Sequence, residues 1–198
     1  MNTSRTHRAA VIGGSAGGLE ALGALVVALG EGCPLVLVAV LHVHRTSSVA
    51  LVAQSLSARG SIVVSEARDK EQARPGQLYL APPDYHLLIE RDGGLALSVD
   101  AKVRWARPSI DVLFESAARA FGKELIGVIL SGANDDGSDG MAAIKRFGGL
   151  TLAQDPASAL HAMMPLSAIE RGVVERVAPI EGIAAILRAR SGATEVER

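Results

Sequence analysis

Three loops of the sequence carry side chains that can form a hydrolytic site if they meet. The first, residues 13–18 (GGSAGG), follows a short apolar run and contains one serine, Ser15. The second, residues 42–48 (HVHRTSS), begins with two histidines, and the third, residues 131–140 (SGANDDGSDG), contains three aspartates. A hydroxyl, an imidazole and a carboxylate are the three groups of a nucleophilic triad. We therefore ask whether the fold brings the three loops together.

Ser15 has three interpretations: a helix N-cap, part of a phosphate-binding loop, or a nucleophile. A dinucleotide-binding loop needs glycines at positions i, i+2 and i+5, and the glycines of residues 13–18 lack this spacing. A P-loop needs Lys and Ser or Thr after its last glycine, where this chain has Leu19 and Glu20. Both differences argue against nucleotide binding. Residues 13–17 do fit G-x-S-x-G, the strand-to-helix turn of nucleophilic serines, and the N-cap stays open as the alternative.

A serine becomes a nucleophile when a base accepts its proton, and histidine has the appropriate pKa. The chain has five histidines: His7, His42, His44, His86 and His161. We expect His7 in the N-terminal tail, and His86 and His161 on the surface. His42 and His44 both leave the second predicted strand at its carboxyl end, so either can be the base.

The base needs a carboxylate to orient it, and Asp135, Asp136 and Asp139 are the candidates. One is enough for a triad, and the others are expected to act as caps of the following helix. Backbone amides at the start of the first helix, including that of Ala16, are suited to stabilising an oxyanion. The order Ser, His, Asp along the chain differs from that of α/β-hydrolases, which run Ser, Asp, His.

The elements that must position these loops alternate between short buried strands and helices, which predicts an α/β protein with a mostly parallel sheet. Such sheets bind ligands beyond the carboxyl ends of their strands, where all three loops are expected. Residues 86–99 predict an antiparallel hairpin around Asp92-Gly93-Gly94. The predicted strands are 8–12, 35–41, 61–67, 78–81, 125–130, 150–153 and 173–177, and the predicted helices are 19–29, 49–57, 109–121, 140–147, 166–171 and 180–190.

Length and composition set further limits. The chain of 198 residues is 48% hydrophobic, which predicts one globular domain at 8–190, with frayed ends at 1–7 and 191–198. Its formal charge of −1 argues against nucleic-acid binding. One cysteine, Cys33, rules out an internal disulfide. The longest apolar run, 34–41, is too short to cross a membrane, so we expect a cytoplasmic protein without membrane insertion.

Taken together, the motifs resemble those of the catalytic domain of the chemotaxis protein-glutamate methylesterases, the CheB family. The resemblance extends from about residue 10 to residue 189. The matching segments are VIGGSAGGLEAL, VLHVHRTSS, LYLAPPDYHL, RPSIDVLFESAA, GVILSGANDDGSDGM and TLAQDPASALHAMMPLSAI.

The resemblance implies a doubly wound parallel sheet with helices on both faces and an antiparallel hairpin. It implies a triad of Ser15, His42 and Asp136, with oxyanion donors at the backbone of Ala16 and Ala133. It implies hydrolysis of glutamate γ-methyl esters on the cytoplasmic helices of chemoreceptors, with no metal or organic cofactor. Glutamine deamidation is an extension of the same chemistry that the family implies.

The chain also departs from the family pattern. Leu41 stands where the family commonly has Gln, and Val43-His44 where it has Met-Pro, so His44 remains an alternative base. Ala133 replaces a frequent Met and Ala16 a frequent Thr. Ser15 lies so close to the N-terminus that we expect either a stand-alone form without a receiver domain, regulated if at all by a separate protein, or a fragment of a longer chain. Two other functions fit the residues: a non-catalytic signalling module of the same fold and a hydrolase of small esters.

Overall fold

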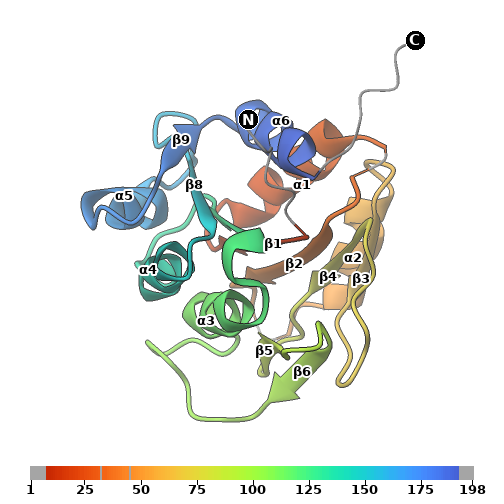
Figure 1. Ribbon diagram of the computed structural model, residues 1–198. Helices are drawn as coiled ribbons and strands as arrows, with labels where there is room; N and C mark the ends of the chain where they lie inside the picture. The colour runs from red at the N-terminus through yellow and green to blue at the C-terminus, as the bar shows by residue number, and fades with distance from the viewer. Residues whose placement is uncertain (1–7, 32, 45, 192–198) are drawn as a thin grey trace, which may run out of the picture.

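A computed structural model describes residues 8–31, 33–44 and 46–191 of the chain. Its centre is a seven-stranded sheet in the order β3-β4-β2-β1-β7-β8-β9, with every neighbouring pair parallel (Figure 1). The strands are β1 (Ala9–Gly14), β2 (Val36–Leu41), β3 (Val63–Glu66), β4 (Gln77–Leu80), β7 (Leu125–Ile129), β8 (Leu150–Gln154) and β9 (Arg176–Ala178). Because the chain extends the sheet from β1 first to one side and then to the other, the fold is doubly wound, as the resemblance implies.

Helices cover both faces of the sheet. One hydrophobic core joins the sheet to α1 (Gly18–Leu29), α2 (Val49–Ser57) and α6 (Ile180–Arg190). The other joins it to α3 (Ile110–Phe121), α4 (Ser138–Arg146), α5 (Met163–Glu170) and the antiparallel hairpin of β5 (His86–Ile89) and β6 (Leu95–Ser98). A short 3-10 turn, η1 (Gly122–Glu124), leads into β7.

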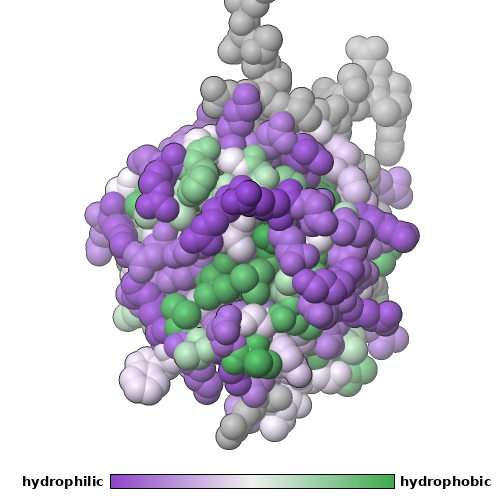
Figure 2. Space-filling model, turned by 60° about the horizontal axis from the view of Figure 1, so that its bottom comes forward, coloured by the Kyte–Doolittle hydropathy of each residue, from purple (hydrophilic) through white to green (hydrophobic). Residues whose placement is uncertain are grey.

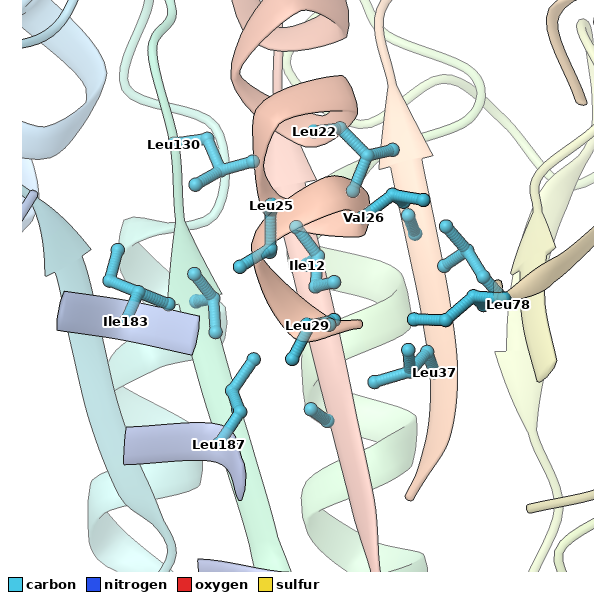
Figure 3. Packing of buried hydrophobic residues seen from close by; sticks show 14 of the residues in the cluster. Ile12, Leu22, Leu25, Val26, Leu29, Leu37, Leu78, Leu130, Ile183 and Leu187 are labelled. Carbon is cyan, nitrogen blue, oxygen red and sulfur yellow. The ribbon is translucent and has the colours of Figure 1, made fainter. Parts of the chain in front are cut away.

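Aliphatic side chains build the first core, in a chain that is only 3% aromatic. Leu22, Leu25, Val26 and Leu29 on α1 belong to the same cluster as Ile12 of β1, and all lie where α1 packs on the sheet (Figure 3). Each of these side chains is at most 1% exposed. A helix packed in this way fixes the direction in which the chain leaves β1, and so fixes the turn that carries Ser15.

The register of the strands aligns the three loops. Gly14 of β1 pairs with Leu41 of β2, and Gly13 pairs with Ile129 of β7. Neighbouring strands lie about 4.8 Å apart, so the residues that follow β1, β2 and β7 emerge side by side. The first central strand continues to Gly14, two residues beyond the predicted end, because Gly13 and Gly14 keep this pairing.

The other element predictions differ from the structure mainly at their ends. The helices at 49–57 and 180–190 have the predicted bounds, whereas α5 begins three residues early, at Met163. Pro165 falls in the first turn of α5, where a proline is tolerated because its missing N–H would have no partner within the helix. β9 is shorter than predicted and begins at Arg176.

The chain ends predicted to fray, 1–7 and 192–198, lie outside the described residues. Ser191, which we had placed with the C-terminal tail, is buried, and its N–H donates to the Leu187 carbonyl. In the part of the chain that the structure describes, no helix is both long and apolar enough to span a bilayer.

Candidate active site

Ser15 directly follows β1, in the turn that leads into α1. The N-cap of α1 is Gly17, in the left-handed region with φ 74°, and no side chain caps the helix. Within the described residues the Ser15 hydroxyl makes no hydrogen bond, while its backbone N–H donates to the Ser131 carbonyl at 3.0 Å. The N-cap interpretation of Ser15 is therefore wrong, and its hydroxyl is half-buried without a structural partner.

The turn that holds Ser15 is fixed by the neighbouring loops. The Ser131 hydroxyl donates to the Ala16 carbonyl at 2.8 Å and accepts the His161 N–H at 2.9 Å. A Cβ atom on Gly17 would lie 2.7 Å from that hydroxyl oxygen and 2.8 Å from the Leu160 Cβ. The glycine thus provides both the positive φ and the space that this turn needs.

His42 follows β2 and contacts Asp136. Its Nε2 lies 2.9 Å from Asp136 Oδ2, an ion-pair contact in which the ring N–H is not aligned as in a hydrogen bond. Its Nδ1 lies 3.3 Å from the Asn134 side-chain amide nitrogen. His44, by contrast, is exposed, and its Nδ1 lies 2.7 Å from the Thr46 hydroxyl. The structure thus brings His42, and not His44, to the carboxylate.

Asp136 is 1% exposed and accepts hydrogen bonds from the start of α3. Its carboxylate accepts the Ile110 N–H at 2.8 Å, the Asp111 N–H at 3.1 Å and the Ser109 hydroxyl at 2.9 Å. Asp136 therefore caps α3 in place of the N-cap residue Ser109, whose own side chain makes no capping bond. Burial alone would raise the pKa of Asp136, but the contact with His42 and the two amides outweigh burial and hold this pKa below its ordinary value.

The two other aspartates of this loop form ion pairs and make no capping bond to α4, so their predicted capping role is wrong. Asp139 does lie in the first turn of α4, where its charge favours the helix dipole. Asp135 and Asp139 both contact the Arg104 guanidinium, and Asp139 also contacts Arg171. The N-cap of α4 is Gly137, with φ 99° and no side-chain capping bond. Hydrogen bonds from Arg104 and Arg171 lower the pKa of Asp139.

Asp111, in the first turn of α3, adds a second buried carboxylate beside Asp136. Its Oδ1 accepts the Gly140 N–H at 2.7 Å, whereas its Oδ2 has no hydrogen bond from any described residue and lies 3.3 Å from Arg104 Nε. Burial, together with the charges of Asp136 and Asp139, raises the pKa of Asp111 to about 7, against the opposing effects of Gly140 and Arg104.

The two predicted oxyanion donors lie in the loops after β1 and β7. Among the described residues, neither the N–H of Ala16 nor that of Ala133 has a hydrogen-bond acceptor. Both amides are therefore available to a ligand, and their role stays a prediction.

Of the two histidines predicted to lie on the surface, one is exposed and the other is buried. His161 is exposed, but His86 is 1% exposed, so the prediction for His86 is wrong. Its Nδ1 accepts the Ser109 N–H at 3.2 Å, and its Nε2 lies 3.1 Å from the Ala101 carbonyl oxygen. His86 thus supports the start of α3, whose amides bind Asp136.

Three residues that contact this site were not predicted from the sequence: Arg104, Ser109 as a partner of Asp136, and Asn134. No local sequence pattern around these residues indicates their role, because each of them contacts a residue that is distant in sequence. Within the described residues, no group of three or more His, Cys, Asp or Glu side chains is arranged to hold a metal ion.

Comparison with known proteins identifies related chains. Residues 10–187 match the family model described as CheB methylesterase. A relative from Leptospira interrogans, a putative protein-glutamate methylesterase/protein-glutamine glutaminase, is 43% identical over 90% of this chain and 92% of its own length. A protein-glutamate methylesterase/protein-glutamine glutaminase of Pseudomonas aeruginosa is 38% identical over 92% of this chain and 52% of its own length. The crystal structure of the Thermotoga maritima CheB methylesterase catalytic domain superposes with a TM-score of 0.87, at 31% identity, and covers 92% of this chain and 97% of that one.

Proposed function

Because the chain belongs to the CheB methylesterase family, we propose that it hydrolyses glutamate γ-methyl esters on the cytoplasmic helices of chemoreceptors. Its relatives carry the names methylesterase and glutaminase together. The same active site is suited to glutamine deamidation, because a side-chain amide differs from the ester only in its leaving group. The contact between His42 and buried Asp136 carries this proposal. Ser15 follows Gly14, whose carbonyl accepts the His42 N–H at 3.0 Å.

In the proposed mechanism Ser15 attacks the ester carbonyl and His42 accepts the hydroxyl proton. Since His42 Nε2 faces Asp136, its Nδ1 is the nitrogen that takes the proton. Asn134 occupies that nitrogen in the free protein and has to yield to Ser15, and catalytic hydrogen bonds commonly tighten only when substrate binds. The negative charge of Asp136 stabilises the imidazolium that forms.

The tetrahedral intermediate places its oxyanion against the amides of Ala16 and Ala133, which have no acceptor among the described residues. His42 then returns the proton to the departing methanol, leaving an acyl-enzyme on Ser15. A water molecule, deprotonated by His42, attacks this ester and releases the glutamate carboxylate and the Ser15 hydroxyl. No step requires a metal ion or an organic cofactor.

We place this reaction in the cytoplasm, where the signalling helices of the receptors lie, with a separate regulatory protein as a further partner. A non-catalytic signalling module of the same fold is the competing function. Its sequence support is the altered segment after His42, where Val43-His44 replaces Met-Pro of the family. The geometry favours the enzyme, because a binding module has no need of a histidine held against a buried carboxylate.

The test is release of methanol from a methylated receptor fragment. We expect the wild-type protein to release methanol and Ser15→Ala to release none above the uncatalysed rate. Ser158→Ala, which changes an exposed serine outside the three loops, is the matched control and should keep wild-type activity. Full activity of Ser15→Ala would contradict the serine mechanism, and an inactive wild-type protein would support the binding module.

A further inference from the structure

A tight turn at residues 103–106 lies beside the loop that carries Asp136. Val103 and Ala106 exchange two backbone hydrogen bonds, of 3.1 Å and 2.8 Å. The two residues between them, Arg104 and Trp105, have φ values of 48° and 64°. Two-residue turns of this left-handed kind favour Asn and Gly, because a Cβ atom is unfavourable there. Larger residues at both positions therefore need compensation from elsewhere.

Arg104 provides this compensation through the site itself. Its guanidinium contacts Asp135 and Asp139 and lies 3.3 Å from Asp111. Asp135 directly precedes Asp136, so the turn is fastened to the loop of the candidate triad. Since all three partners are acidic, the positive charge of Arg104 is neutralised where it lies.

Arg107 holds the other side of the same segment. Its guanidinium donates to Asp84 at 3.0 Å, and to the carbonyl oxygens of Val99 and Asp100 at 2.8 Å and 3.0 Å. The segment 99–107 is thus anchored by two arginines, one on each side of Trp105. Such anchoring lowers the entropy that the segment loses when it binds a partner.

Trp105 is 94% exposed at the tip of this turn, and it is the only tryptophan in the sequence. Val99, at the start of the anchored segment, is 68% exposed. Figure 2 shows the molecule turned so that the bottom of Figure 1 comes forward. On this face, hydrophobic side chains gather in the middle and hydrophilic ones surround them. Tryptophan is the residue type most enriched among energetically dominant interface contacts.

We propose that Trp105 is a docking residue for the protein substrate, packing against an apolar side chain of the helix that bears the ester. This inference rests on the proposed function. The ion pairs of Arg104 hold the turn against the loop that carries Asp136. A protein substrate that places one side chain at Ser15 is long enough to reach Trp105 as well, whereas a small ester is not. Trp105 therefore determines specificity for a macromolecular substrate and takes no part in the chemistry.

Fluorescence tests the contact directly, because Trp105 is the only tryptophan. A Trp-free methylated receptor fragment is added to the Ser15→Ala protein, which binds without turnover. We expect the emission to shift to shorter wavelength and acrylamide quenching to fall as the fragment saturates the protein. The concentration for half-saturation should equal the Kd obtained by calorimetry.

Kinetics separate docking from chemistry. Trp105→Ala should raise the KM for the receptor fragment about tenfold, with kcat within about twofold of wild type, as expected for a docking contact. Trp105→Phe should recover part of the loss. The rate at which a small fluorophosphonate labels Ser15 should not change. Phe147→Ala is the matched control and should behave as wild type. Phe147 is an exposed aromatic residue between the end of α4 and the start of β8, so it lies at the end of the sheet away from the candidate site.

The outcomes are distinct. A wild-type protein that releases no methanol overturns the proposed function, and the docking role with it. The docking role alone is overturned by a second result. In that case the wild-type protein releases methanol, the receptor fragment does not change the emission of Trp105, and Trp105→Ala does not change the KM. A third result assigns Trp105 to self-association and also overturns the proposal. In that case the emission shifts with protein concentration in the absence of receptor, and sedimentation shows a dimer that Trp105→Ala dissociates.

Discussion

Asp136 contacts His42 Nε2 at 2.9 Å with the same carboxylate that accepts two backbone amides at the start of α3. One buried side chain thus joins the loop after β2 to the start of α3. The amides of Ile110 and Asp111 stabilise the negative charge that the imidazolium needs. The position of the carboxylate is therefore set by the fold and not by His42 alone.

Replacing Asp136 should affect both activity and stability. Asp136→Asn should lower kcat by a factor on the order of 10,000, because an amide no longer stabilises the imidazolium. Asp136→Ala should in addition lower the free energy of unfolding by about 2–3 kcal/mol, since the Ile110 and Asp111 amides lose their acceptor. Methanol release and urea unfolding measure the two effects.

Asp135→Asn is the matched control for Asp136, because the two residues are neighbours in the same loop. Asp135 is exposed and pairs with Arg104. We expect its loss to change kcat by less than about tenfold and the unfolding free energy by less than about 1 kcal/mol, as for exposed ion pairs. Equal losses in the two Asn variants would refute the special role of Asp136.

The two histidines after β2 provide a separate test. His42→Ala should abolish methanol release, while His44→Ala should keep it within a few-fold of wild type. The reason is contact: His42 meets Asp136, whereas the ring of exposed His44 bonds to the Thr46 hydroxyl. Both variants are assayed with the same receptor fragment, and activity that survives in His42→Ala but not in His44→Ala would assign the base to His44.

Much of the fold could be predicted from the sequence, because the signals were local and periodic. Continuous apolar runs such as residues 35–41 predict buried parallel strands, and helical spacing at 49–57 gives the bounds of α2. The convergence of the loops after β1, β2 and β7 also followed, since parallel strands end at one edge of a sheet. Residues alone left His42 and His44 open, and the resemblance chose between them.

What escaped prediction depends on contacts between distant segments. His86 was expected on the surface, but it is buried, and the Ser109 N–H, 23 residues away, satisfies its Nδ1. Ser109 has the residue type of an N-cap, yet a carboxylate from another loop caps α3 in its place. The ion pairs of Arg104 span 31 and 35 residues of sequence, and no local pattern indicates them.

The raised pKa of Asp111 predicts an unusual dependence of stability on pH. The ordinary pKa of an unfolded aspartate is about 3.9, and burial raises the pKa of Asp111 in the folded protein to about 7. Between these values the folded state holds a proton that the unfolded state has released. Stability contributed by this group therefore falls as pH rises from about 4 to about 7.

Asp111→Asn should remove this dependence, because asparagine keeps an acceptor for the Gly140 N–H and does not ionise. From pH 4.5 to 7.5 the free energy of unfolding should fall by about 1–3 kcal/mol more in wild type than in the variant. The lowered pKa values of Asp136 and Asp139 act in the opposite sense, and only at more acidic pH. Parallel urea curves for the two proteins across this range would refute the assignment.

Two glycines at opposite ends of α1 separate backbone strain from steric exclusion at the site. Gly17 and Gly30 both have positive φ, 74° and 61°. A Cβ on Gly30 would meet nothing within 4 Å, whereas one on Gly17 would lie 2.7 Å from the Ser131 hydroxyl oxygen. Alanine therefore incurs the conformational cost at both positions and a clash at Gly17 only.

Gly30→Ala should lower the free energy of unfolding by about 1 kcal/mol and leave kcat unchanged. Gly17→Ala should lower it by about 2–4 kcal/mol, because the Ser131 hydroxyl and Leu160 have to move. It should also reduce kcat at least about 100-fold, since a displacement of about 1 Å in the turn misplaces Ser15 against His42. Thermal unfolding and methanol release, measured on both variants, test this, and wild-type kcat in folded Gly17→Ala would show that the turn does not set the position of the nucleophile.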